Sequence, residues 1–182
     1  QVSEIKELLP PDLFPCADFC REDVLVHLRS LGLQTSLDWL SLARCAEHLT
    51  TLVDGATIEM REERWRRAEH LLHYLDANVN ALLGLDEQGR EVTKGLFGLS
   101  LFDNVKPEDK HAREMKIISS ASWLPVLHGT EKKHVPFPKR EAFGVAPPGE
   151  SRPIEDMGLC SAQVPVCSQQ VKSKSLHRLF GW

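Results

Sequence analysis

Several histidine and cysteine side chains are spaced in a way that could bind a metal ion. His70 and His73 are three residues apart, and Cys45 precedes His48 by the same interval. Residues three apart on a helix share one face, so each pair could point toward one ion. A metal site needs more ligands than either pair supplies, and such side chains beside an apolar stripe are more often packing residues. The sequence therefore predicts no bound metal.

The five cysteines do not form a recognisable metal or disulfide framework. They are Cys16, Cys20, Cys45, Cys160 and Cys167. Their number is odd, and Cys16 and Cys20 form neither a C-x-x-C motif nor one half of a zinc site. We therefore expect free thiols that pack like small hydrophobic side chains in a reducing compartment.

No arrangement of serines predicts a hydrolase. Ser119, Ser120 and Ser122 lie in a polar run, and the sequence has no Gly-x-Ser-x-Gly motif. The sequence therefore predicts no catalytic residue, no cofactor-binding residue and no enzyme.

Two basic tracts are candidates for binding a partner. Residues 61–67 alternate in sign, which is typical of a solvated helix face with side-chain pairs. The second tract consists of Lys132 and Lys133, followed by Lys139 and Arg140. It lies among prolines and could bind an acidic peptide, although a simple soluble loop is the alternative. Including a nearby tryptophan, the predicted partner-binding residues are Trp123, Lys132, Lys133, Phe137, Lys139 and Arg140.

The composition is that of a folded protein. Hydrophobic residues make up 42% of the 182 residues and charged residues 26%. The formal net charge of −4 gives no general attraction to nucleic acid, and no apolar run is long enough for membrane insertion. The chain begins without Met or a signal pattern, so we expect a soluble fragment of a larger chain.

Two helices are predicted near the start of the chain. Asp18 could cap a helix that ends near Leu31 and packs through Leu28, with Gly32 after its end. Thr35 and Asp38 then resemble a capping box. The two helices should pack as an antiparallel hairpin, because few residues separate them.

Apolar spacing predicts the second and third helices most clearly. The second extends to about Val53, and the third covers about 58–83 and ends at Gly84. The apolar positions alternate in steps of three and four: Trp39, Leu42, Ala46, Leu49 and Val53 in one helix, and Ile58, Trp65, Ala68, Leu72, Leu75, Val79 and Leu82 in the other. We expect them to pack on each other rather than in a coiled coil.

The second half of the chain is predicted to be less regular. After a loop over 84–106, a short helix starts near Pro107 and carries Met115, Ile117 and Ile118. Prolines predict loop-like backbone over 125–153. Short strands between Ile154 and Val166 and a helix over about 172–180 complete the pattern.

These elements predict an α+β fold that is predominantly α. We expect a bundle of three to five helices, an irregular proline-rich segment and a few short strands. The expected organisation is an extended segment at 1–17, a helical hairpin plus a long helix at 18–84, and the less regular remainder at 85–182. These parts should form one structural unit.

Five sequence blocks resemble the large repeats of sacsin. They are the block from Phe14 to Leu49 with LRSLGL, the AEHLLHYLDAN helix, the SSASWLPV tract, the proline-rich stretch after it, and the closing LHRLFGW. Their order and distances carry the resemblance more than any one block does. The stretch HVPFPKREAFG lacks a Trp that is typical of the family.

The resemblance implies a non-enzymatic scaffold module of a cytoplasmic co-chaperone. Its implied partners are proteins, namely chaperone machinery, unfolded clients or cytoskeletal filaments. A purely structural spacer is an alternative.

A nucleotide-dependent chaperone ATPase is the second alternative, because repeats of this family begin with a domain similar to the ATPase domain of heat-shock chaperones. Asp76 and Asn80 resemble its Glu-x-x-x-Asn-Ala segment, and Asp156 with Gly158 weakly resembles its adenine loop. Asp is shorter than the required Glu, Cys160 replaces a glycine, and the glycine-rich lid is missing from the sequence. Asp76 and Asn80 are therefore predicted to form a solvated helix face.

Overall fold

The computed structural model describes residues 21–31, 37–51, 58–86, 111–127, 143–158 and 163–182. Its helices are α2 (Glu22–Ser30), α3 (Trp39–Thr51), α4 (Ile58–Leu82), α6 (Ala112–Ser120) and α7 (Lys174–Phe180). Its strands are β1 (Leu124–Leu127), β2 (Phe143–Ala146) and β3 (Val166–Cys167), and its 3-10 helices are η5 (Pro148–Glu150) and η6 (Ile154–Gly158). The predicted α+β, predominantly α fold class is confirmed.

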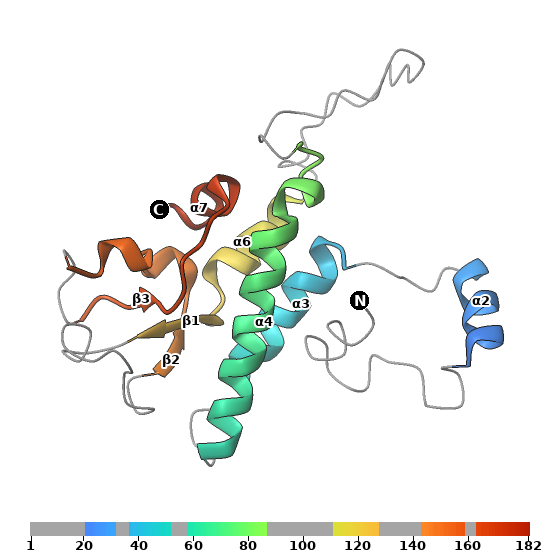
Figure 1. Cartoon of the computed structure of the whole chain (residues 1–182), viewed down its shortest axis with the longest axis horizontal. Coiled ribbons are helices and arrows are strands. Elements are labelled where there is room, and N and C mark those ends of the chain that lie inside the picture. Colours follow the sequence, from blue (N-terminus) through green and yellow to red (C-terminus); the bar gives the residue numbers. More distant parts are fainter. Residues whose placement is uncertain (1–20, 32–36, 52–57, 87–110, 128–142, 159–162) are drawn as a thin grey trace.

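Helix α4 packs against elements from both halves of the chain. It contacts α3, α7 and the strands β1 and β2, as Figure 1 shows, while α6 packs on α3. The predicted apolar positions Ala68, Leu72, Leu75 and Val79 are buried, and Leu71 is buried with them. No helix among the described residues combines the length and apolarity needed to span a bilayer.

The start of α3 differs in one respect from the predicted capping box. The helix begins at Trp39, and the Asp38 carboxylate accepts a hydrogen bond of 2.8 Å from the Ser41 amide. Asp38 is therefore the capping residue itself, which is a common role for Asp. Thr35 lies outside the described residues. The Trp39 indole then donates to the Leu82 carbonyl at 3.1 Å and joins the start of α3 to the end of α4.

Gly84 ends α4 as predicted. Its φ of 70° lies in the left-handed region, where an L side chain is strained. The Gly84 amide donates to the Ala81 carbonyl and the Leu85 amide to the Asn80 carbonyl, at 3.1 and 2.7 Å. This hydrogen-bond pattern is a Schellman motif, which satisfies the last carbonyls of a helix.

The three strands form one small antiparallel sheet in the order β2-β1-β3. The loop-like backbone predicted for 125–153 is therefore wrong at β1 and β2, because Pro125 lies in the central strand opposite Val145. The Pro125 carbonyl accepts from the Ser168 amide at 2.9 Å. In an antiparallel sheet the nitrogen and the carbonyl of one residue face the same neighbouring strand. The nitrogen of Pro125, which carries no hydrogen, therefore faces the end of β3, where the paired residues of β1 are Val126 and Leu127.

The described residues between Ile154 and Val166 contain less strand than predicted. Residues 154–158 form the 3-10 helix η6, and within the part that the structure describes only β3, which begins at Val166, is a strand. The Cys167 amide donates to the Arg152 carbonyl, and the Arg152 amide donates to the Pro165 carbonyl, at 2.8 and 3.0 Å. These bonds form an isolated parallel bridge between Arg152 and Val166 of β3.

Helix α2 does not pack in the predicted hairpin. It begins at Glu22 after Arg21, whose side chain makes no capping hydrogen bond, and none of its residues is buried. Figure 1 shows α2 standing apart from the helices and the sheet. The predicted packing through Leu28 is wrong for the described residues, while the predicted cap Asp18 and the predicted turn at Gly32 lie outside them.

The helix predicted from Pro107 begins later, at Ala112. Pro107 itself lies outside the described residues. Met115 and Ile118 are buried and Ile117 is half-buried, so the predicted apolar face of α6 is confirmed. The helix ends at Ser120, within the polar run of Ser119, Ser120 and Ser122.

Candidate functional site

Trp123 is a core residue, although its sequence position suggested a partner-binding surface. Its side chain is fully buried, and its indole donates to the Ile118 carbonyl at 2.6 Å. Its ring lies 6.0 Å from the Phe180 ring in an edge-to-face arrangement. Trp123 therefore anchors α7 and cannot contact a partner while the chain is folded. The other predicted binding residues, Lys132, Lys133, Phe137, Lys139 and Arg140, lie outside the described residues.

Asp76 holds the segment that leads into α7. Its carboxylate accepts hydrogen bonds from the backbone amides of Lys172, at 2.9 and 3.2 Å, and of Ser173, at 2.8 Å. Ser173 is the N-cap of α7, and its hydroxyl accepts from the Leu176 amide at 3.4 Å. One carboxylate thus joins α4 to a segment about a hundred positions later in the chain.

Two further polar contacts lie on either side of Asp76 along α4. The Glu69 carboxylate accepts a hydrogen bond from the Gln169 side-chain amide at 2.9 Å. The side-chain oxygen Oδ1 of Asn80 accepts a hydrogen bond from the Ser175 hydroxyl at 2.7 Å. Positions 69, 76 and 80 are seven and four residues apart, so they share one face of the helix. We call these three side chains of α4, with the groups that bond to them, the α4–α7 seam.

The seam corrects the prediction that Asp76 and Asn80 form a solvated helix face. Both side chains are half-buried and hydrogen-bonded to the C-terminal part of the chain. The same two residues are the ones that resemble an ATP site. In the described structure their oxygens position a protein segment.

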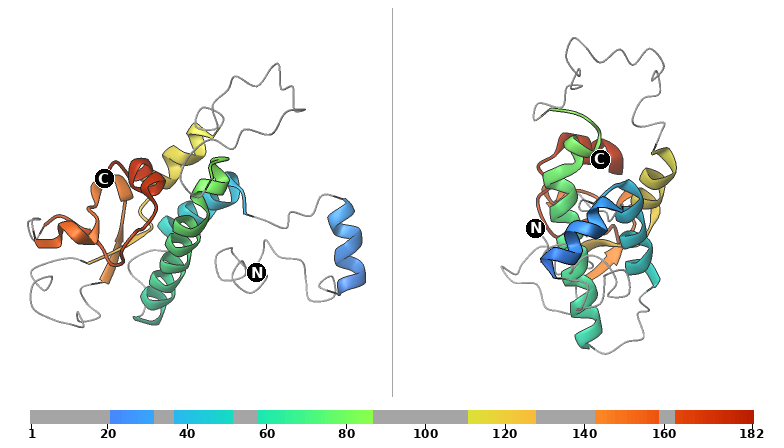
Figure 2. Two further views of the ribbon diagram at one scale, coloured as in Figure 1. Left: turned by 45° about the horizontal axis from the view of Figure 1, so that its top comes forward. Right: turned by 90° about the vertical axis from the view of Figure 1, so that its right-hand side faces the viewer.

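Apolar and aromatic side chains complete the attachment of α7. Leu176 and Phe180 are buried, and the Trp182 ring lies 5.1 Å from the Phe180 ring. The Trp182 indole donates to the Pro148 carbonyl at 3.2 Å. The views in Figure 2 show α7 beside the upper half of α4 and near α6. Helix α7 is therefore held by a polar seam on one side and by the core on the other.

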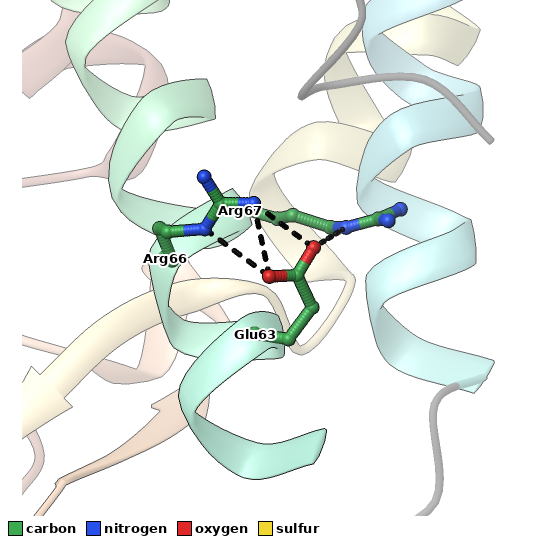
Figure 3. A network of polar contacts seen from close by, with 3 residues as sticks. All are labelled: Glu63, Arg66 and Arg67. Atoms are coloured by element: carbon green, nitrogen blue, oxygen red, sulfur yellow. Dashed lines mark hydrogen bonds and ion pairs between the residues drawn. The ribbon is translucent and has the colours of Figure 1, made fainter. Parts of the chain in front are cut away.

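The first basic tract forms the predicted side-chain pairs on α4. Glu63 accepts from Arg66 at 3.0 Å and from Arg67 at 2.8 Å (Figure 3). These bonds, with that to Arg67 the strongest, hold the pKa of the Glu63 carboxyl below its usual value. Arg64 is an exception to the solvated face, because it is buried and donates to the Ser122 carbonyl at 3.4 Å.

The thiols within the described residues are buried. Burial raises the pKa of Cys45 to about 12 and that of Cys167 to about 11. Both are therefore protonated near neutral pH, whereas a metal ligand or nucleophile must be a thiolate. Across the described ranges, no group of three or more His, Cys, Asp or Glu residues could hold a metal ion.

Helix α2 has accessible apolar side chains and no buried residue. Val26 is 54% exposed and Leu31, at its C-cap, is 83% exposed. Arg21 pairs with Asp23, and Arg29 pairs with Glu22. Val26 lies beside the second pair, because it is four residues after Glu22 and three before Arg29. An amphipathic helix of this kind can lie in a groove of another protein. We therefore regard α2 as the candidate protein-binding element.

Sequence reasoning missed most of the seam, although one signal for it was present. Glu69, Asp76 and Asn80 follow the same period as the apolar stripe beside them. Polar side chains with that period at the edge of a buried stripe are placed to meet another element. The identity of that element, the segment from Gln169 to Ser175, could not be read from the spacing.

The fold and its seam define a mostly helical α+β module with a docked C-terminal helix. No protein-family model, no curated protein and no solved structure matches the chain. Its function is therefore argued from the arrangement of its own residues and from the sequence resemblance.

Proposed function

We propose that the chain is a non-enzymatic protein-interaction module of a sacsin-like co-chaperone, acting in protein quality control in the cytoplasm. The sequence resemblance supplies the class of partner: chaperone machinery, unfolded clients or cytoskeletal filaments. Helix α2 is the observation that carries the proposal, because it is amphipathic and none of its residues is buried.

The use of Asp76 and Asn80 favours a binding module over an ATPase. An ATP site would need the carboxylate to position water and the amide to hold magnesium. Here the Asp76 carboxylate accepts hydrogen bonds from two backbone amides, and the Asn80 side chain accepts one from the Ser175 hydroxyl. Nucleotide binding at these residues would have to break the seam.

Calorimetry of the chain with MgATP separates the two functions. We expect no binding heat at micromolar concentrations. Micromolar binding that is lost in Asp76→Asn and kept in Glu69→Gln would establish the ATPase and refute the module. Glu69 is a matched control because it lies on the same face of α4 and its carboxylate also accepts a seam hydrogen bond.

Client binding can be tested by the aggregation of chemically denatured citrate synthase. The chain should slow aggregation, and Val26→Ser with Leu31→Ser should remove most of that effect. Leu40→Ser with Met60→Ser is the control, because these apolar side chains are 48% and 54% exposed but lie on α3 and α4. Equal losses in both double variants would exclude α2 as the binding element. A wild-type chain without effect on this client, on filaments or on chaperones would favour the structural spacer.

A further inference from the structure

Ser175 contributes to the α4–α7 seam by donating the proton of its side-chain hydroxyl in a hydrogen bond. Its Oγ donates to the Asn80 carbonyl oxygen at 2.7 Å, and Asp76 lies one helical turn before Asn80 on the same face. Asp76 is itself bonded to the amides of Lys172 and Ser173. The Ser175 hydroxyl therefore bonds to one side chain of α4, and a carboxylate of the same helix bonds to the backbone two residues before it.

The sequence around Ser175 is basic on the side that precedes it. Lys172 and Lys174 lie three residues and one residue before it, and both are exposed. Serine kinases that recognise basic substrates read such charges by electrostatic complementarity. Ser175 is half-buried rather than buried, so a local opening of the seven-residue helix α7 is enough to present it.

We propose that Ser175 is a phosphorylation site for a basic-directed serine kinase and that its modification releases α7 from α4. In the transfer, the Ser175 oxygen forms a bond to the γ-phosphorus of MgATP, the bond from that phosphorus to ADP breaks, and the kinase's base takes the hydroxyl proton. This inference does not depend on the function proposed above.

Two changes at the seam follow from the modification. The phosphoester has no proton to donate to Asn80, so that hydrogen bond is lost. The phosphate also brings a charge of about −1.5 to −2 to the first turn of α7, and the negative Asp76 carboxylate is bonded to the N-cap residue of the same helix. A phosphate in the first turn favours the helix itself, so α7 should leave α4 without losing its tendency to be helical.

The site is tested by treating the folded chain with MgATP and the catalytic subunit of cyclic-AMP-dependent protein kinase. Mass spectrometry should find phosphate on Ser175. Ser119 is a matched control because Lys116 lies three residues before it, while its hydroxyl bonds only within α6, to the Lys116 carbonyl at 3.0 Å. Phosphate confined to Ser173 or to Ser119, or absent from the chain, would overturn the assignment.

The release of α7 is tested on a chain phosphorylated completely at Ser175. Cys167 allows a synthetic peptide spanning 167–182 to be ligated to residues 1–166 and the product to be refolded. The control is the same ligation with unmodified Ser175. Amide hydrogen exchange over 172–180 should be at least about tenfold faster in the phosphorylated chain, as expected when a hydrogen bond is lost and like charges meet.

Three results of the exchange experiment would contradict the release of α7. One is equal exchange over 172–180 in the two ligated chains. Another is an acceleration that extends to α3, because the whole chain would then be destabilised. A third is the same acceleration in Ser119→Glu, because a negative charge outside the seam would then suffice.

Discussion

A side-chain carboxylate can stabilise a fold when it accepts hydrogen bonds from backbone amides of a distant segment. Asp76 does this for the amides of Lys172 and Ser173, which lie 96 and 97 positions later in the chain. Asp23 offers a contrast, because it pairs with its neighbour Arg21 on the surface, where both side chains are more than half exposed. Exposed pairs of this kind add little stability.

Replacing Asp76 should therefore destabilise the protein more than replacing Asp23. We expect Asp76→Ala to lower the free energy of unfolding by about 1 to 3 kcal/mol, since two amides lose a charged acceptor. Asp23→Ala should cost less than about 0.5 kcal/mol. Urea unfolding followed by circular dichroism measures both. Equal costs would show that the seam does not stabilise the docked C-terminal segment.

The buried thiols should make stability fall at alkaline pH. Cys45 ionises near its ordinary pKa of 9.0 when the chain is unfolded, but burial raises its pKa to about 12 in the folded state. Its contribution is complete below pH 9.0 and is lost as the pH rises toward about 12, because only the unfolded state releases the proton.

A thiol deletion tests this pH dependence. Between pH 9 and 11, the free energy of unfolding of Cys45→Ala should fall less steeply than that of the wild type, by at most about 1.4 kcal/mol per pH unit. Parallel pH profiles of the two proteins would mean that Cys45 ionises equally in the folded and unfolded states. Unfolding in urea at each pH provides the measurement.

At the scale of elements, helix ends were predictable where one residue type has a distinct backbone preference. Gly84 has a φ of 70° and closes α4, and Gly181 has a φ of 76° and closes α7. Asp38 caps α3 through a hydrogen bond within three residues, although Thr35 was predicted as the cap. Interactions of this kind are local, so the sequence contains the information they need.

Substituting Gly84 tests the value of this local geometry. A Cβ at Gly84 would meet no atom within 4 Å, so any cost comes from the left-handed backbone. We expect Gly84→Ala to cost about 1 to 2 kcal/mol. Gly149→Ala is the control, because its Cβ would make an ordinary contact of 3.4 Å with the Ser119 carbonyl. Thermal unfolding measures both, and a Gly84→Ala protein as stable as wild type would argue against the observed helix end.

At the scale of the whole molecule, burial distinguishes helices that look alike in the sequence. Leu28 of α2 and Leu72 of α4 occupy equivalent apolar positions in their predicted stripes. Leu72 is buried in the core, whereas α2 has no buried residue. Apolar periodicity predicts that a face exists but does not say what covers it.

The two leucines should accordingly respond differently to truncation. Leu72→Ala should cost about 2 to 5 kcal/mol, because it leaves a cavity in a packed core. Leu28→Ala should cost less than about 1 kcal/mol. Denaturant unfolding measures both. A large loss at Leu28 would restore the predicted hairpin between the first two helices, and a small loss at Leu72 would contradict the observed core.

The sequence by itself determined the long helices, their apolar stripes and the Gly84 helix end, because these depend on residues within a few positions of each other. Tertiary structure decided the rest. Pro125 can lie in the central strand because the ladder between β1 and β3 covers only Val126 and Leu127. Trp123 is buried in the core, where its ring meets that of Phe180 in α7. Asp76 and Asn80 became a seam because a segment far along the chain brought donors to them. Such pairings join distant positions, and hydrophobic periodicity carries no information about which partner a face will meet.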